Sequence, residues 1–252
     1  MVAVAATGRI RSVIVPILFA VVGCAILVSL GFWQLHRLAW KEALIHAVET
    51  RIGAPAVPAP GPEMWQPFDI DRFDYQHVAL RGRFGTDEVH VYTVLSDPHG
   101  SLSGQGYWIV TPFVTDGGWR VFVNRGFVPG DGKGPAAYPP PPPGDVALDG
   151  VLRGAEQAGT FTPKASPETR LFFVRDPVEI SAALGLKDRP VAPYTVDATS
   201  AFTPPGGVPQ AGETRTIFPN SHLQYALTWF GLAIGLVGVM VAFVWRRLHG
   251  TT

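Results

Sequence analysis

The sequence predicts a membrane protein in which two transmembrane α-helices flank one mainly antiparallel β (α+β) extracytoplasmic domain, whose strands can close partly into a barrel. Two uncharged runs of 23 residues, 13–35 and 223–245, are each long enough to cross a hydrocarbon core of ~30 Å. All 20 acidic residues lie between these runs. The region between them contains one strand-like segment after another. A freely soluble protein is therefore excluded.

The first apolar run resembles a signal peptide in one respect, because Arg9 and Arg11 precede it. Its length exceeds the usual apolar core of about 7–15 residues, and it ends in Gly-Phe-Trp-Gln rather than a cleavage site. We interpret it as a retained anchor. The expected organisation is a cytoplasmic segment 1–12, a helix over 13–35, a domain over 36–221, a helix over 222–245 and a cytoplasmic segment 246–252.

Charge gives a first indication of orientation. Two arginines precede the first run and Arg246 and Arg247 follow the second, which favours cytoplasmic termini. Arg37 and Lys41, just inside the first run, weaken this count. The middle region has 16 basic and 20 acidic residues, a net charge of −4, so nucleic acid is not an expected partner. The single cysteine, Cys24, lies in the first run and is expected to be a packing residue.

Each element of the domain has a local signal. The first helix is expected to continue to residue 51 as an amphipathic helix, followed by a Pro/Ala-rich extended linker over 53–67. Asp176-Pro-Val-Glu179 is typical of a helix start, and Gly185 of its end. Pro112 indicates an edge or a bulge, and the proline run 139–143 a stiff loop. Strands are predicted over 75–84, 88–95, 107–114, 119–124, 146–152, 171–174 and 194–196.

The sequence contains none of the hydrolase, metalloprotease, nucleotide-binding or dithiol motifs that we sought, so it is not expected to be an enzyme. His77, His90 and His99 are scattered, and we interpret them as surface or core histidines rather than metal ligands. Gly231-x-x-x-Gly235 in the second run and Ala25-x-x-x-Ser29 in the first fit a close-packing pattern. They predict that the two helices pack against each other through these faces, the alternative being chance.

Polar and aromatic residues gather where the two membrane helices meet the outer interface. His222, Tyr225 and Trp229 share one stripe of the second helix, and Trp33 and Arg37 lie at the end of the first. The aromatic residues also fit an ordinary interfacial belt without any ligand. Arg37 fits lipid-phosphate binding as well as ligand binding. His222 is a functional candidate because an ionisable side chain at the end of a membrane helix is costly.

Six segments, in order, resemble the Surfeit locus family of cytochrome c oxidase assembly factors, in the form that bacteria carry. The first-helix exit, Gly31-Phe-Trp-Gln-Leu-His-Arg37 with Trp40-Lys41, is similar to the family's. The second-helix entry from Asn220 to Gly231 is similar as well. The remaining segments are Val110-Thr-Pro-Phe113, Val123-Asn-Arg-Gly-Phe-Val-Pro129, Phe173-Val-Arg-Asp176 and Gly212-Glu-Thr-Arg215. The proline run matches no motif of the family.

The resemblance implies a two-span protein of the bacterial inner membrane with its domain facing the periplasm or cell exterior. A bacterial source is expected because no long Arg/Ser-rich presequence precedes residue 12. The implied role is assembly of haem–copper (aa3-type) cytochrome c oxidase, binding haem a or assisting its insertion into subunit I. Expected partners are subunit I, membrane lipid and, as a further candidate, haem a synthase. The alternative is a membrane-tethered scaffold on nascent subunit I without haem contact.

The family's haem-associated histidine matches His222, which becomes the candidate ligand of haem iron. Trp33, Tyr225 and Trp229 are candidates to lie against the macrocycle, and Arg37 to bind its propionates. These five residues form the candidate cofactor site, and no catalytic residue is expected. Arg125 is expected to be structural, pairing with an acid of the domain beside a close backbone approach at Gly126; contact with the oxidase or a propionate is the alternative.

Overall fold

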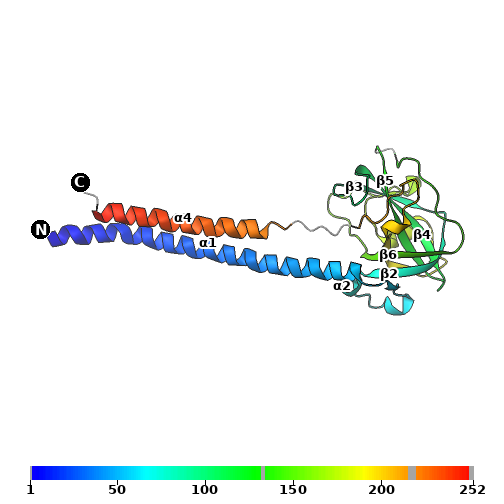
Figure 1. Ribbon diagram of the computed structural model, residues 1–252, viewed down its shortest axis with the longest axis horizontal. Helices are drawn as coiled ribbons and strands as arrows, with labels where there is room; N and C mark the ends of the chain where they lie inside the picture. The colour runs from blue at the N-terminus through cyan, green and yellow to red at the C-terminus, as the bar shows by residue number, and fades with distance from the viewer. Residues whose placement is uncertain (1, 132–133, 215–219, 250–252) are drawn as a thin grey trace. The chain divides into compact units, whose positions relative to one another are not determined.

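A computed structural model describes residues 2–131, 134–214 and 220–249. The chain divides into two compact units, which we describe separately (Figure 1). One contains Met1–Ala47 and Ile217–Thr252, and the other contains Val48–Thr216.

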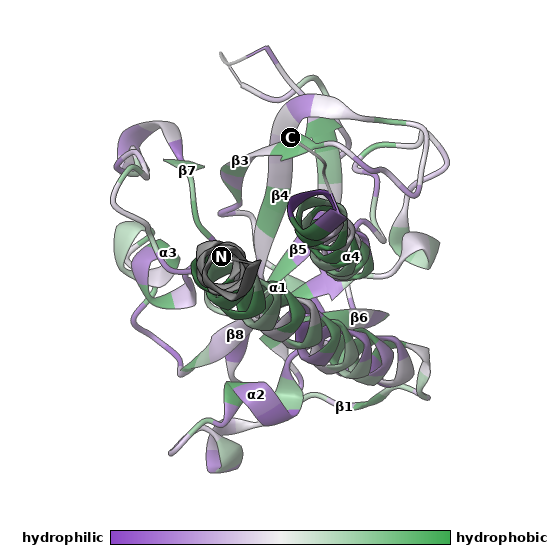
Figure 2. Cartoon of the chain, turned by 90° about the vertical axis from the view of Figure 1, so that its left-hand side faces the viewer, coloured by the Kyte–Doolittle hydropathy of each residue, from purple (hydrophilic) through white to green (hydrophobic). Residues whose placement is uncertain are grey.

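The first unit is built from two long helices, α1 (Val2–Gly53) and α4 (His222–His249). Both are long and apolar enough to cross a membrane, which fits a protein with two spans. Figure 2 shows hydrophobic residues along most of α4, whose last turn holds Arg246, Arg247 and His249. As predicted, the first helix continues beyond its apolar run, and it reaches Gly53.

The two helices pack along a seam whose residues are spaced alternately by three and four, as in a left-handed coiled coil. Cys24 Sγ lies 3.7 Å from the Ala233 carbonyl oxygen, and Phe32 packs edge-on against Phe230. A Cβ at Gly31 would meet the Phe230 ring at 2.5 Å, so this glycine permits the close approach. The less exposed seam residues are Ile17, Ala20, Cys24, Leu27, Gly31, Gln34 and Leu38 on α1, and His222, Ala226, Trp229, Ala233, Leu236 and Met240 on α4.

The small-residue pattern therefore pointed to the wrong faces. Gly231 and Gly235 are exposed, with no atom within 4 Å of a Cβ built on either, and Ala25 and Ser29 are exposed as well. The helices do pack together, but the alanines and glycines that allow it occupy the seam positions. The spacing of small residues within one helix identifies a face made of small side chains, but it does not show which face contacts the other helix.

The second unit is a β barrel, which confirms the predicted fold class. Within the described residues, five strands close in the order β2-β6-β8-β5-β4, because β4 pairs back onto β2 (Figure 1). The pairs are antiparallel except β5–β8. Their bounds are β2 His77–Phe84, β4 Gly104–Thr115, β5 Arg120–Pro129, β6 Val146–Gly154 and β8 Val191–Ala198.

Further elements extend this barrel. They are β1 (Val57–Pro58) on β2, β3 (Val89–Leu95) on β4, β7 (Leu171–Phe172) on β3, the helices α2 (Ile70–Phe73) and α3 (Pro177–Ala183), and 3₁₀ turns at Pro62–Met64, Pro167–Thr169 and Ser200–Phe202. Asp176 caps α3, as predicted, by accepting from the backbone N–H of Val178 at 2.8 Å. The short α2, capped by Asp69, was not predicted.

Pro112 lies inside the sheet rather than at its edge. It separates Val110, which pairs with β3, from Phe113, which pairs with β2. The strand changes partner at this point, so the missing N–H of proline interrupts neither ladder. The strand bulge lies nearby, between Trp108 and Val110.

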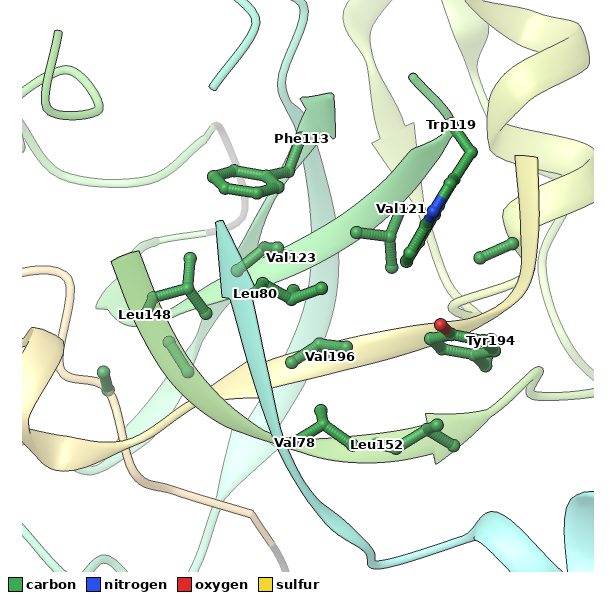
Figure 3. Close-up of a cluster of buried hydrophobic side chains, with 13 residues drawn as sticks. Val78, Leu80, Phe113, Trp119, Val121, Val123, Leu148, Leu152, Tyr194 and Val196 are labelled. Carbon is green, nitrogen blue, oxygen red and sulfur yellow. The ribbon is translucent and has the colours of Figure 1, made fainter. Parts of the chain in front are cut away.

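Alternation along the central strand β5 builds two cores, one on each face. Val121 and Val123 point into the barrel, whereas Phe122 points to a second cluster with Phe172 of β7 and Ile180 of α3. The barrel cluster is drawn in Figure 3; its buried residues are Val78, Leu80, Phe113, Trp119, Val121, Val123, Leu148, Leu152, Ala192, Tyr194, Val196, Ala198 and Ala211. Coverage on both faces explains why nine of the ten β5 residues are buried.

Candidate functional site

His222 lies against the first helix. It opens α4, and its backbone N–H donates to the Asn220 side chain at 3.4 Å. Its ring Nδ1 lies 2.7 Å from Oε1 of Gln34 on α1. The end of the apolar run of α1 and the start of α4 therefore meet at one level of the helix pair, as a hairpin of two spans requires.

This contact holds the imidazole ring against α1. An amide oxygen only accepts hydrogen bonds, so Nδ1 of His222 is the donor in its contact with Gln34. In a neutral imidazole, Nε2 would then carry the lone pair. A partner on the other ring nitrogen is the usual way in which proteins hold a metal-ligating histidine in one tautomer and orientation. The half-buried His222 could supply this imidazole nitrogen to a metal such as haem iron.

Arg37 lies one turn further along α1 than Gln34. Its guanidinium carbon lies 4.1 Å from the centroid of the Trp40 ring, a cation–π arrangement. The guanidinium is exposed, so its N–H groups can still donate to an anion such as a carboxylate or phosphate. Trp40 was not among the predicted site residues, although its spacing of three from Arg37 is a helical-neighbour signal.

The three predicted aromatic residues differ in exposure. Trp33 and Tyr225 are 56% and 53% exposed, so their rings offer apolar faces on the outer surface of the helix pair. Trp229 is half-buried and belongs to the seam. The contacts described above join His222 to Gln34 and Arg37 to Trp40, and neither joins two of the five predicted residues.

Gln34 lies in the first-helix exit segment 31–37, to which the sequence analysis gave no role at this position. The available signal was its position three residues after Gly31 and four before Leu38, on the stripe that meets α4. A polar amide on such a stripe needs a partner from the facing helix. Recognising this contact required knowing which face of α1 meets α4, and the small-residue pattern had predicted the wrong face.

The domain motifs build two buried polar networks. Arg125, expected to pair with an acid, donates from Nη1 to Glu88 Oε2 at 3.1 Å and from Nη2 to the Pro139 carbonyl oxygen at 2.9 Å. Glu88 also accepts from the Tyr138 hydroxyl at 2.7 Å, which in turn accepts from Nε2 of His90. Burial and the bond to Glu88 raise the pKa of Tyr138, so its proton stays on the hydroxyl. The predicted pairing of Arg125 with an acid of the domain is confirmed.

The second network joins five segments of the chain. Asp197 of β8 accepts from Arg175, from Asn124 Nδ2 at 3.0 Å and from the Thr214 hydroxyl at 3.1 Å. Arg175 also donates to Glu156 at 2.7 Å. The carbonyl of the Asn124 side chain accepts from the backbone N–H of Gly126 at 3.1 Å. These family-like segments therefore stabilise the barrel, apart from Arg215, which lies outside the described residues.

Gly126 has the close approach expected of it. Its φ of 130° disfavours a side chain, and a Cβ would lie 2.4 Å from backbone atoms of Gln210. His77, His90 and His99 hydrogen-bond to Ala54, Tyr138 and Gly212 respectively. Within the described residues, no group of three or more His, Cys, Asp or Glu side chains is placed to hold a metal ion.

The fold defines a class of two-span proteins in which two apolar helices flank a barrel domain. Where the two helices meet, a side-chain amide holds a histidine. Residues 21–234 match the model of the SURF1 family. The chain is 36% identical over 216 residues to Surfeit locus protein 1 of Mus musculus, covering 81% of this chain and 67% of the relative. It is 35% identical over 238 residues to Surfeit locus protein 1 of Homo sapiens, covering 88% and 74%. The chain belongs to the SURF1 family.

Proposed function

We propose that this protein assists the assembly of haem–copper (aa3-type) cytochrome c oxidase by holding haem a at His222 before the haem enters subunit I. The single observation that carries this proposal is the hydrogen bond from His222 Nδ1 to Gln34. It leaves Nε2 as a lone-pair donor at the helix junction. Membership of a family associated with oxidase assembly supplies the context.

The surroundings suit a cargo that is apolar over most of its surface and anionic at one edge. The exposed rings of Trp33 and Tyr225 offer area for a flat macrocycle, and the half-buried Trp229 lies in the seam. Arg37 offers charged donors one helical turn from Gln34 for carboxylates. A single protein ligand on an exposed surface would hold the haem and still allow its release.

The compartment and partners follow from the same proposal. We place the chain in the bacterial inner membrane with both termini cytoplasmic and the barrel domain in the periplasm or outside the cell. Subunit I receives the haem, haem a synthase is the candidate source, and lipid surrounds the two spans. A scaffold that binds nascent subunit I without haem is the competing function.

The proposal is tested by expressing the full chain together with a haem a synthesis pathway and measuring haem a in the purified protein. His222→Ala should lose the pigment while inserting normally into the membrane. His249→Ala is the matched control, because it removes a histidine from the opposite end of the same helix. Equal haem a in both variants would leave the scaffold function in place of haem binding.

Orientation has its own test. Alkaline phosphatase fused after Pro141 of the barrel domain should be active, because the enzyme matures outside the cytoplasm, whereas a fusion after Thr252 should be inactive. The reverse pattern would contradict the proposed topology without bearing on haem.

A further inference from the structure

The barrel domain presents an exposed phenylalanine on a hydrogen-bonded turn over residues 159–162. The Gly159 N–H donates to the Thr162 hydroxyl at 2.8 Å, and the Thr162 N–H donates to the Gly159 carbonyl at 3.1 Å. Phe161 of this turn is 96% exposed, and Val178 on α3 is 71% exposed. Both side chains leave apolar area in water, which is unfavourable unless another surface covers it.

A groove of about 330 Å³ opens beside this turn. Its lining comes from the chain on both sides of Phe161, at Ala158 and 162–165, from Phe172 of β7 and the residues after it, and from Glu179 and Ala183 of α3 (Figure 2). A cavity of about 150 Å³ holds a benzene ring, so the groove has room for a phenyl side chain. The exposed ring of Phe161 does not fill the groove of its own chain.

A projecting ring and a groove on the same surface are what a two-fold dimer requires. Both copies of such a dimer use the same patch, so the ring of each copy meets the groove of the other. A ring and a groove on different faces would instead add copies head to tail. Phe161 lies between the groove residues Ala158 and Thr162 in the chain, which favours the closed pair.

The charges at the groove also suit a second copy. Lys164 and Glu179 both line it, both are exposed, and neither side chain forms an ion pair in the part of the chain that the structure describes. A patch with charges of one sign would repel its own copy, whereas this patch carries one charge of each sign. The two charges come from different elements, so a two-fold pairing can set Lys164 of each copy against Glu179 of the other.

We propose that the turn 159–162 and this groove form the interface of a two-fold homodimer, with Phe161 of each copy in the groove of the other. Burying one phenylalanine removes roughly 150–250 Å² from water. Two rings and the groove surfaces that face them therefore bury on the order of 600–1,000 Å², the size of a weak and reversible interface. None of the five candidate haem residues takes part, so the dimer is independent of haem binding.

The test is resonance energy transfer between full-length chains that carry a donor or an acceptor fluorophore after Thr252. The chains are placed in phosphatidylcholine liposomes at increasing protein density, and the wild-type chain should associate reversibly. Phe161→Ser should weaken association about a hundredfold, because each lost ring costs about tenfold and a dimer contains two. Met64→Ser is the matched control: Met64 is exposed in the same domain but outside the groove, so association should not change.

Exchanging the two charges tests the contact between copies. Lys164→Glu and Glu179→Lys should each weaken self-association about tenfold, because like charges then face each other. A mixture of the two variants should associate like the wild-type chain, since unlike charges meet again between different chains. The matched control is a mixture of Asp149→Lys and Lys187→Glu, exposed residues outside the groove, which should associate no better than either variant alone.

Three results would overturn the proposal. The first is wild-type association by Phe161→Ser. The second is a mixture of the Lys164 and Glu179 variants that associates no better than each variant alone. The third is a wild-type chain that stays monomeric at every density, which would leave the groove to a different protein.

Discussion

Replacing Arg175 by alanine tests whether the family-like segments of the domain serve stability rather than partner contact. The guanidinium is buried and donates to Asp197 and, at 2.7 and 2.9 Å, to Glu156. Burial acts against the charge of Arg175, but the two carboxylates outweigh it and raise its pKa, so Arg175 stays charged. Removing it leaves Asp197, whose side chain is 7% exposed, with neutral donors alone.

Breaking a buried ion pair by removing one partner costs about 3–5 kcal/mol, because the remaining charge is left uncompensated. We therefore expect the free energy of unfolding of the barrel domain to fall by that amount in Arg175→Ala. For a domain of this size, the melting temperature should decrease by roughly 6–20 °C. The value within this range depends on how far water reaches the Asp197 carboxylate in the variant.

The assay is thermal unfolding of the full chain in detergent, followed by tryptophan fluorescence. Trp119 and Trp65 are in the barrel domain and pack edge to face, so the change in signal on unfolding includes a contribution from its core. Arg189→Ala is the matched control: its side chain is 44% exposed and pairs with an exposed aspartate, so no measurable change is expected. Arg175→Ala with wild-type melting but defective oxidase assembly would refute the structural role and indicate a partner contact.

Three further outcomes follow from particular contacts. Burial lowers the pKa of His90, so the stability that this histidine contributes is present above about pH 6.5, its pKa in the unfolded chain, and is lost as the pH falls below that value. His90→Gln should flatten the dependence of the melting temperature on pH, and an unchanged slope would contradict this prediction. Gly126→Ala should cost more than about 1 kcal/mol in a denaturant titration, since φ is positive and Gln210 backbone is in the way; a wild-type midpoint would disprove the close approach. Gln34→Leu should lower the haem a content about tenfold through the loss of the partner on Nδ1, and full retention would speak against that role.

Local signals predicted most elements of the domain, because each depends on neighbouring residues. The strands around Val91 and Val123 and the cap at Asp176 lie where alternation and capping chemistry placed them. A partly closed barrel was among the predictions, but which strands close it and the parallel β5–β8 pair were not predictable, because strand pairing depends on contacts far apart in sequence. The short α2 contains too few residues for a periodic pattern.

The candidate site shows the same division. His222 was identifiable because an ionisable group at the start of an apolar helix is unusual. Its partner Gln34 depends on which stripe of α1 faces α4, a stripe that also includes Gly31 packed against Phe230 and that composition does not reveal. Arg125 was predicted from the sequence to pair with an acid of the domain, and it does so with Glu88.

Chemical rescue at His222 tests the central claim most directly. His222→Gly in the full chain, co-expressed with a haem a synthesis pathway, should purify without haem a, and added imidazole should restore the pigment and its visible spectrum by replacing the missing ligand. A His222→Gly protein that retains haem a with the wild-type spectrum in the absence of imidazole would contradict the account, since His222 would then not be the ligand.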